Sequence, residues 1–190
     1  MKLSGHEQGV MMTSNDALVT KVMAAQLGYF NDEYSKLFLK NKKKMYPIIN
    51  RGTWSRVQAY RQTITKFLTA FKDAPNVNIL SLGGGYDTTF FWLLQEDPSL
   101  STRLCYVEVD YDSVVNKKIE VINKNANIKE MILNDSAESS PYEINADNYK
   151  LFACNVCDTQ SLSAKLQEFK VAGNVPTLVL TECLLIYLEP

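Results

Sequence analysis

The feature that most constrains this chain is a run of three glycines at residues 83–85, set between two apolar segments. The apolar segment before it, residues 77–82, has the length of a strand, and residues 88–95 after it have the pattern of a helix. Glycine has no Cβ, so it can adopt positive φ and let a ligand lie against the backbone. The helix N-terminus adds unpaired N–H groups and a partial positive charge. This unit is typical of a site for a nucleotide-like ligand.

Two common nucleotide motifs do not fit this turn. Gly83 is not followed by the Gly-Lys-Ser/Thr spacing that a triphosphate requires. Counting Gly-x-Gly-x-x-Gly from Gly83 places Thr88 where a dinucleotide site has its third glycine. An ordinary strand-to-helix turn can have the same composition, so the rest of the chain has to decide between a ligand site and a plain turn.

The chain beyond the turn continues to alternate between strands and helices. Strands are predicted at residues 103–110, 128–133, 149–154 and 177–187, helices at 113–123 and 158–170, and a loop at 134–148. Apolar strands that alternate with helices are typical of a parallel sheet covered on both faces. We therefore predict an α/β fold with a Rossmann-like, mostly parallel sheet.

Two helical segments are predicted before the sheet. Apolar residues recur at helical spacing from Ser14 onward, and a long amphipathic helix follows after residues 48–52. Lys21 lies on the first helix, where composition gives no reason to separate it from any solvated lysine. Arg56 flanks the apolar stripe of the second helix, from which it could reach a cleft beside the sheet.

Polar residues stand where the predicted strands end. The glycines follow the first strand, Asp110 ends the second, and Asn155 and Glu182 lie at the ends of two later strands. Ligands of open α/β sheets bind beyond the carboxyl ends of the strands, where an acid after the second strand accepts hydrogen bonds from ribose hydroxyls. Asp110 or Asp112 could also cap the helix that follows, and both roles can coexist. Four strand ends therefore predict one cleft.

Composition removes several classes of protein. The single histidine, His6, lies near the N-terminus. The chain therefore lacks a positioned histidine base for a Ser-His-Asp or Cys-His hydrolase and the ligands for a histidine-rich metal site. Cys154 and Cys157 form a C-x-x-C pair without a second pair, and no metal site is predicted. The net charge of −1 argues against binding to nucleic acid or a membrane surface, and no apolar run reaches the ~18 residues of a membrane span. Irregularly spaced cysteines suit the cytoplasm, which is the expected location.

With these residues in view, the chain resembles the leucine carboxyl methyltransferase family. Its members use S-adenosylmethionine to methyl-esterify the C-terminal leucine of type-2A protein phosphatase catalytic subunits. The resemblance covers residues 21–190 and rests on five segments together: Gly28-Tyr29-Phe30-Asn31-Asp32, residues 49–57, residues 82–90, Glu108-Val109-Asp110 and residues 176–187. It implies a class I methyltransferase fold with an N-terminal helical segment. Since family members continue well beyond this length, the chain is expected to be truncated at its C-terminus.

The resemblance also implies roles for individual residues. Lys21 and Arg56 would contact the methionine carboxylate of the cofactor, and Gly83 and Gly85 would lie against the cofactor. Asp110 would hold the ribose, Asn155 and Val156 would border the adenine, and Glu182 would line the pocket near the amino acid portion. Arg56 and Tyr187 would be the catalytic residues, which orient the substrate carboxylate. The family usually has Asp where this chain has Asn155. Asn can still accept a hydrogen bond but loses the assistance of a charge.

The implied organisation has three parts: a flexible tail at residues 1–12, an N-terminal helical cap at 13–72 and an incomplete cofactor-binding α/β domain at 73–190. The implied function is methyl esterification of the phosphatase tail. It needs no histidine, because a carboxylate is already ionised at neutral pH. Two alternatives stay open: an NAD-dependent oxidoreductase, which would use the same fold and Asp110, and a truncated binding module without catalysis.

Overall fold

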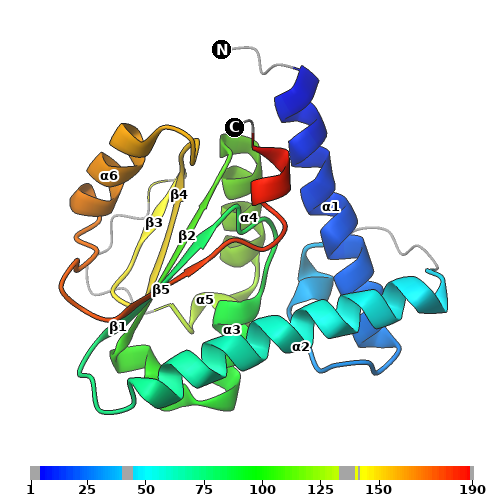
Figure 1. Ribbon diagram of the computed structural model, residues 1–190, viewed down its shortest axis with the longest axis horizontal. Helices are drawn as coiled ribbons and strands as arrows, with labels where there is room; N and C mark the ends of the chain where they lie inside the picture. Colours follow the sequence, from blue (N-terminus) through cyan, green and yellow to red (C-terminus); the bar gives the residue numbers. More distant parts are fainter. Residues whose placement is uncertain (1–4, 40–44, 133–139, 141, 189–190) are drawn as a thin grey trace.

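The computed structural model describes residues 5–39, 45–132, 140 and 142–188, with the backbone alone over residues 5–12. Its centre is a sheet with the strand order β3-β4-β2-β1-β5 (Figure 1). The strands are β1 (Val77–Leu82), β2 (Leu104–Asp110), β3 (Ile144–Asn145), β4 (Tyr149–Ala153) and β5 (Thr177–Leu180). All neighbours pair in parallel except β3, which runs antiparallel to β4. The predicted α/β fold with a mostly parallel sheet is confirmed.

Helices cover both faces of this sheet. They are α1 (Gly5–Gln26), α2 (Pro47–Ala70), α3 (Thr89–Glu96), α4 (Asp112–Lys124), α5 (Ala126–Lys129) and α6 (Thr159–Glu168), with short 3-10 helices η1 (Ser35–Leu37), η2 (Pro98–Thr102) and η3 (Leu185–Tyr187). Strand alternation directs Tyr106 of β2 toward α3 and α4, and its neighbour Val107 toward α6 on the other face. Figure 1 shows α1 and α2 crossing beside the sheet, with η3 next to α1. In the described part of the chain, no helix has the length and apolar character to span a membrane.

The glycine turn joins β1 to α3 as predicted. Gly83 and Gly85 have φ angles of 67° and 55°, in the left-handed region that favours glycine. The N–H groups of Gly83 and Gly84 both donate to the carbonyl oxygen of Val109 on β2, at 2.8 Å and 3.3 Å. The turn is therefore tied to the neighbouring strand and not only to its own.

Two predictions for the middle of the chain are wrong. Residues 128–133 were expected to form a strand, whereas over residues 128–132 α5 ends and the chain turns, and residue 133 lies outside the described part. Ile128 is fully buried within the main core, so the apolar run is explained by helical packing, which a short run cannot reveal by itself. The polar segment expected to be a loop contains β3, whose two residues are too few to give a strand pattern.

Both ends of the chain also differ from the prediction. Over residues 5–12, expected to be a loose tail, the backbone is helical and α1 starts at Gly5, while residues 1–4 lie outside the described part. The strand predicted at 177–187 ends at Leu180. Cys183 has a φ of 55°, which interrupts the extended backbone, and η3 follows.

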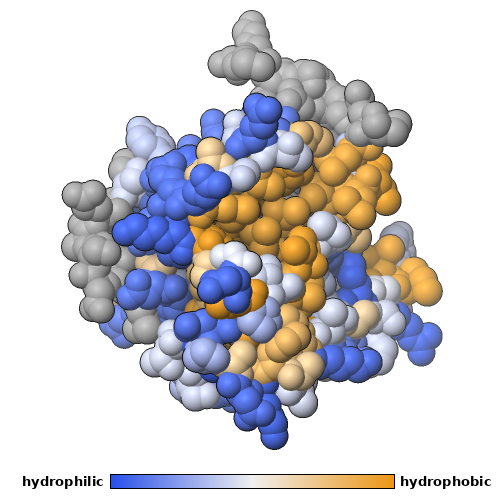
Figure 2. All heavy atoms as spheres, turned by 60° about the vertical axis from the view of Figure 1, so that its left-hand side comes forward, coloured by the Kyte–Doolittle hydropathy of each residue, from blue (hydrophilic) through white to orange (hydrophobic). Residues whose placement is uncertain are grey.

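One edge of the sheet is formed by β5. Within the described residues β1 is its only strand neighbour, and Val179 at its centre is 53% exposed. Leu185 and Ile186, just beyond the strand, are also exposed. Figure 2 shows apolar atoms gathered over a broad area of the face that it presents. Apolar side chains are therefore exposed along this edge of the sheet and just beyond it.

Candidate functional site

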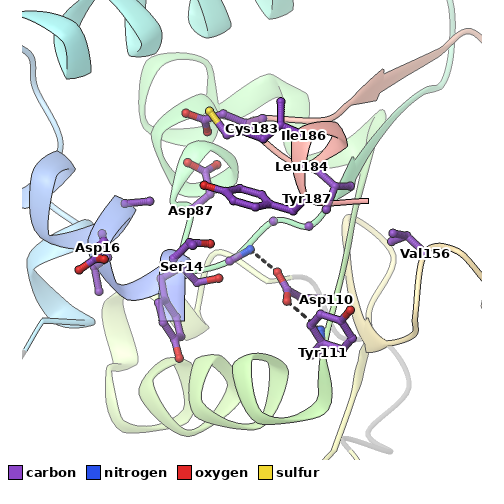
Figure 3. A pocket seen from close by; sticks show the side chains of 18 of the residues that line it. Ser14, Asp16, Asp87, Asp110, Tyr111, Val156, Cys183, Leu184, Ile186 and Tyr187 are labelled. Carbon is purple, nitrogen blue, oxygen red and sulfur yellow. Dashed lines mark hydrogen bonds between the residues drawn. The ribbon is translucent and has the colours of Figure 1, made fainter. Parts of the chain in front are cut away.

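A cavity of about 880 Å³ lies at the carboxyl edge of the sheet, beside the glycine turn. This volume lies in the range of small-molecule sites, roughly 300–1,000 Å³. Figure 3 shows side chains from α1, from the ends of β1, β2 and β4, and from the segment after β5 around it. The lining includes every site residue predicted from the sequence: Lys21, Arg56, Gly83, Gly85, Asp110, Asn155, Val156, Glu182 and Tyr187. Their roles toward a ligand stay predictions.

Asp110 is fixed at the cavity wall by backbone donors. Its Oδ2 accepts a hydrogen bond from the N–H of Gly85 and its Oδ1 one from Tyr111, both at 2.7 Å (Figure 3). Burial raises the pKa of Asp110, and these two N–H groups oppose that rise. Tyr111 occupies the N-cap position of α4, so neither Asp110 nor Asp112 caps that helix by its side chain. Asp110 therefore serves the turn and the cavity.

Four charged residues from distant segments form an ionic cluster at the cavity: Lys21, Arg56, Asp87 and Glu182. The Nζ of Lys21 lies 2.8 Å from Asp87 Oδ1 and 2.9 Å from Glu182 Oε2. Burial alone would lower the pKa of Lys21, but the two carboxylates raise it well above its ordinary value. For the carboxyl group of Asp87 burial acts in the other direction and would raise the pKa, but the positive charges of Lys21 and Lys118 hold this pKa below its ordinary range. All of these contacts favour the charged forms.

Arg56 has hydrogen-bonding capacity that its neighbours do not use. Its Nε lies 2.7 Å from Glu182 Oε1, but the two atoms are not aligned as a hydrogen bond. Its Nη2 is buried and has no hydrogen-bond partner among the described residues. Arg56 as a residue lines the cavity, and a shift of its guanidinium would bring these buried donors to a ligand carboxylate, a partner that suits them.

The glycine turn is closely packed at Gly83 and less so at Gly85. A Cβ at Gly83 would lie 2.8 Å from Cδ1 of Leu184, and one at Gly85 would lie 3.6 Å from Ser14. Leu184 therefore packs against the turn after the chain has left β5. The backbone itself forms the wall there, which suits a ligand lying flat against it.

Asn155 is held in a local turn on the side of the cavity formed after β4. Its Oδ1 accepts a hydrogen bond from the N–H of Cys157 at 3.0 Å. The next residue, Val156, also lines the cavity, and Figure 3 shows it at the side formed after β4. Both residues stand where the sequence placed them, although the Asn155 oxygen already has one partner.

Sequence reasoning missed several lining residues. Asp87 directly follows the glycine run, and its pairing with Lys21 could have been suspected from the opposite charges alone. Lining residues of α1 share one helix face, with spacing i, i+3, i+4 and i+7: Ser14, Ala17, Leu18 and Lys21. No sequence pattern signals Leu184 or Ile186, because they reach the cavity only after the chain turns at Cys183.

Comparison with known proteins gives a consistent result. The family model described as "Leucine carboxyl methyltransferase" matches residues 9–190. "Leucine carboxyl methyltransferase 1 homolog" of Arabidopsis thaliana is 35% identical over 184 residues, which are 95% of this chain and 54% of that protein. "Leucine carboxyl methyltransferase 1" of Bos taurus is 31% identical over 189 residues, 97% of this chain and 55% of that protein. "tRNA wybutosine-synthesizing protein 4" of Aspergillus fumigatus is 28% identical over 182 residues, 95% of this chain but 17% of that protein.

Proposed function

The chain belongs to the leucine carboxyl methyltransferase family, and from this premise we propose that it takes part in methyl esterification of a protein's C-terminal leucine. The methyl donor we propose is S-adenosylmethionine, and the proposed substrate is the tail of a type-2A protein phosphatase catalytic subunit. The chain spans about half the length of the leucine carboxyl methyltransferases that it matches. The observation that carries the proposal is the gathering of nine predicted residues around one cavity.

The cavity fits the proposed cofactor at both ends. Arg56 lines the cavity and would bind the methionine carboxylate after a shift of its guanidinium, and Lys21 adds a second positive charge at the same ionic cluster. The carboxylate of Asp110, already oriented by two N–H groups, would accept hydrogen bonds from the ribose. Val156 and Asn155 would border the adenine. Glu182 and Asp87 would face the amino group, which their charge favours.

S-adenosylmethionine supplies a methyl group on a positively charged sulfur, which any well-placed carboxylate can attack. The residues of this chain then have to bind the cofactor and the substrate, orient the carboxylate toward the methyl group, and exclude water from the site. The substrate carboxylate is ionised at neutral pH, so no residue has to remove a proton. Arg56 presents a planar fork that can hold a carboxylate through two hydrogen bonds, and Tyr187 would provide a weaker contact. Leu184 and Ile186 give this side of the cavity an apolar surface.

We also propose how the chain is divided. The helical cap at residues 13–72 and the α/β domain at 73–190 would meet at the ionic cluster, since Lys21 and Arg56 come from the first part and Asp87 and Glu182 from the second. The four cysteines are all free, which fits a cytoplasmic setting. The oxidoreductase alternative loses its support, because the family match extends over the strand ends that it would have shared.

The reaction can be tested with S-adenosylmethionine that carries a labelled methyl group. The intact phosphatase catalytic subunit should gain label as a base-labile ester. The same subunit without its terminal leucine should gain none. If the chain binds the cofactor but labels neither protein, it is the binding module without catalysis, and the catalytic part of this proposal is wrong.

A further inference from the structure

A buried lysine outside the cavity connects the glycine turn to the sheet. Lys118 lies on α4, and its side chain is 0% exposed. Its Nζ forms an ion pair with Glu108 of β2 and donates a hydrogen bond to the backbone oxygen of Asp87 at 2.6 Å. Neither Lys118 nor Glu108 is among the residues that line the cavity. The roles proposed for the cavity residues therefore leave this pair unexplained.

Such a pair is not explained by stability alone. Removing an ammonium and a carboxylate from water costs several kcal/mol for each ion, and apolar residues of the same volume often serve a core as well or better. Glu108 also lies close to two large buried aromatic side chains, those of Tyr106 and Tyr149. In some proteins a buried polar or ionic group fixes one arrangement of the groups that it contacts.

The groups joined here are the two sides of the glycine turn. Asp87 is where the turn passes into α3, and Lys118 holds its carbonyl oxygen. Glu108 lies beneath the middle of the turn, since a Cβ on Gly84 would stand 3.3 Å from Glu108 Oε2. The ion pair therefore contacts the turn at two points: Glu108 lies against Gly84, and Lys118 donates a hydrogen bond to Asp87.

The pair also acts on the side chain of Asp87, which belongs to the ionic cluster. The positive charge of Lys118 favours the ionised form of that carboxylate, as Lys21 does. The same carboxylate accepts a hydrogen bond from the N–H of Thr89 at 3.0 Å, at the start of α3. Moving the Asp87 backbone would therefore displace a contact of Lys21 in the cavity wall.

We propose that Lys118, supported by Glu108, is a positioning residue that sets the glycine turn in the conformation that accepts the cofactor. The identity of that cofactor rests on the proposed function, whereas the hold of Lys118 on the turn rests on the contacts above. Without the ammonium, the segment from Gly84 to Asp87 loses its anchor on the α4 side and opens more often.

The test compares Lys118→Met with a matched variant, Lys150→Met. Lys150 is also a buried lysine, and its Nζ donates to Asn145 Oδ1 and to the oxygen of Ala146, at 2.8 Å and 3.0 Å, away from the turn. Two quantities are measured on the whole chain: amide hydrogen exchange over residues 83–89, and the Kd for S-adenosylhomocysteine by calorimetry. Lys118→Met should speed exchange in this segment and weaken binding at least tenfold. Lys150→Met should lower the melting temperature and leave both quantities unchanged.

The double variant Lys118→Met with Glu108→Gln guards against misfolding, because it leaves no unpaired buried charge. It should show the same loosened turn and weakened binding. Unchanged exchange and unchanged Kd in either folded variant would overturn the proposal. If the wild-type chain binds no S-adenosylhomocysteine, the proposed function fails, and the exchange comparison alone then decides whether Lys118 positions the turn.

Discussion

Asp110 takes its orientation from two backbone N–H groups, those of Gly85 and Tyr111. A carboxylate held in this way does not have to be ordered when a ligand arrives, so less of the binding free energy is lost to ordering. Each of its oxygens still has acceptor capacity left, because a carboxylate offers about four acceptor positions in total. A single side chain therefore fixes the glycine turn and presents acceptors to the cavity.

Asp110→Asn tests this role. One of the two N–H donors would then face an NH₂ group, which cannot accept a hydrogen bond, so the turn and the ligand site are both disturbed. We expect S-adenosylhomocysteine to bind at least tenfold more weakly, which is about 1.4 kcal/mol. Asp97→Asn is the matched control, because Asp97 accepts the N–H of Ser99 at the start of η2 and is not among the residues that line the cavity. Equal loss in both variants, or none in Asp110→Asn, would contradict the assigned role.

Glu108 predicts a specific dependence of stability on pH. Burial raises its pKa to about 7, with Lys118 opposing the rise, Asp87 adding to it and Tyr149 opposing it. The folded state therefore takes up a proton more readily than the unfolded chain, whose glutamate titrates near 4.5. It follows that the stability contributed by Glu108 is fully present below about pH 4.5 and is lost as the pH rises toward 7.

Urea unfolding of the wild type and of Glu108→Gln between pH 4 and pH 8 measures this contribution. Relative to Glu108→Gln, the wild type should lose unfolding free energy as the pH rises from 4.5 to 7. Below pH 4.5 and above pH 7 the difference between the two proteins should stay constant. Comparing the two proteins removes the effects of other titrating groups. Parallel curves across the whole range would show that Glu108 does not titrate there.

Among the helices and strands, local patterns predicted those that have clear boundaries. Continuous apolar runs gave β1, β2 and β4 to within one residue, because buried parallel strands carry no polar alternation. The strand proposed near Ile128 was wrong because helical packing decides between strand and helix for a short apolar run. The end of β5 depends on the turn at Cys183 and on the packing of Leu184 against Gly83, which are tertiary contacts.

The same distinction applies to the candidate site. Strand ends and the family resemblance led to nine of the residues that line the cavity. Most of them lie in a recognisable local segment, whereas Lys21 came from the resemblance alone. Asp87 and Lys118 were missed, although Lys118 holds the very turn that organises the sequence. The hydrogen bond between them joins positions 31 residues apart, and no local sequence pattern around either residue predicts it.

Gly83→Ala tests the demands of the glycine turn. An L-residue at a φ of 67° is strained by about 1–2 kcal/mol. The added Cβ would also come within 2.8 Å of Leu184, whose side chain would have to move. We expect unfolding free energy to fall by about this amount and cofactor binding to weaken. Gly173→Ala, where nothing lies within 4 Å of the added Cβ, is the control and should cost little. Equal stability of the two variants would contradict the strain.

At the level of the whole molecule, the cavity depends on contacts between segments that are far apart in the chain. Lys21 and Glu182 are separated by 161 positions, yet they form an ion pair beside the glycine turn. A ligand that binds Arg56, Asp110 and the turn together would touch the helical segment and the sheet at once. Its binding should therefore stabilise the fold as a unit and not one element of it.

Calorimetric titration of the wild-type chain with S-adenosylhomocysteine tests most directly whether this cavity is a methyl donor site. We predict saturable heat with one site per chain. At a ligand concentration 100 times the Kd, linkage adds about 2.7 kcal/mol of stability, which raises the melting temperature of a chain of this size by roughly 5–10 °C. A folded sample that gives neither heat nor a shift in melting temperature would show that the cavity does not bind the proposed cofactor.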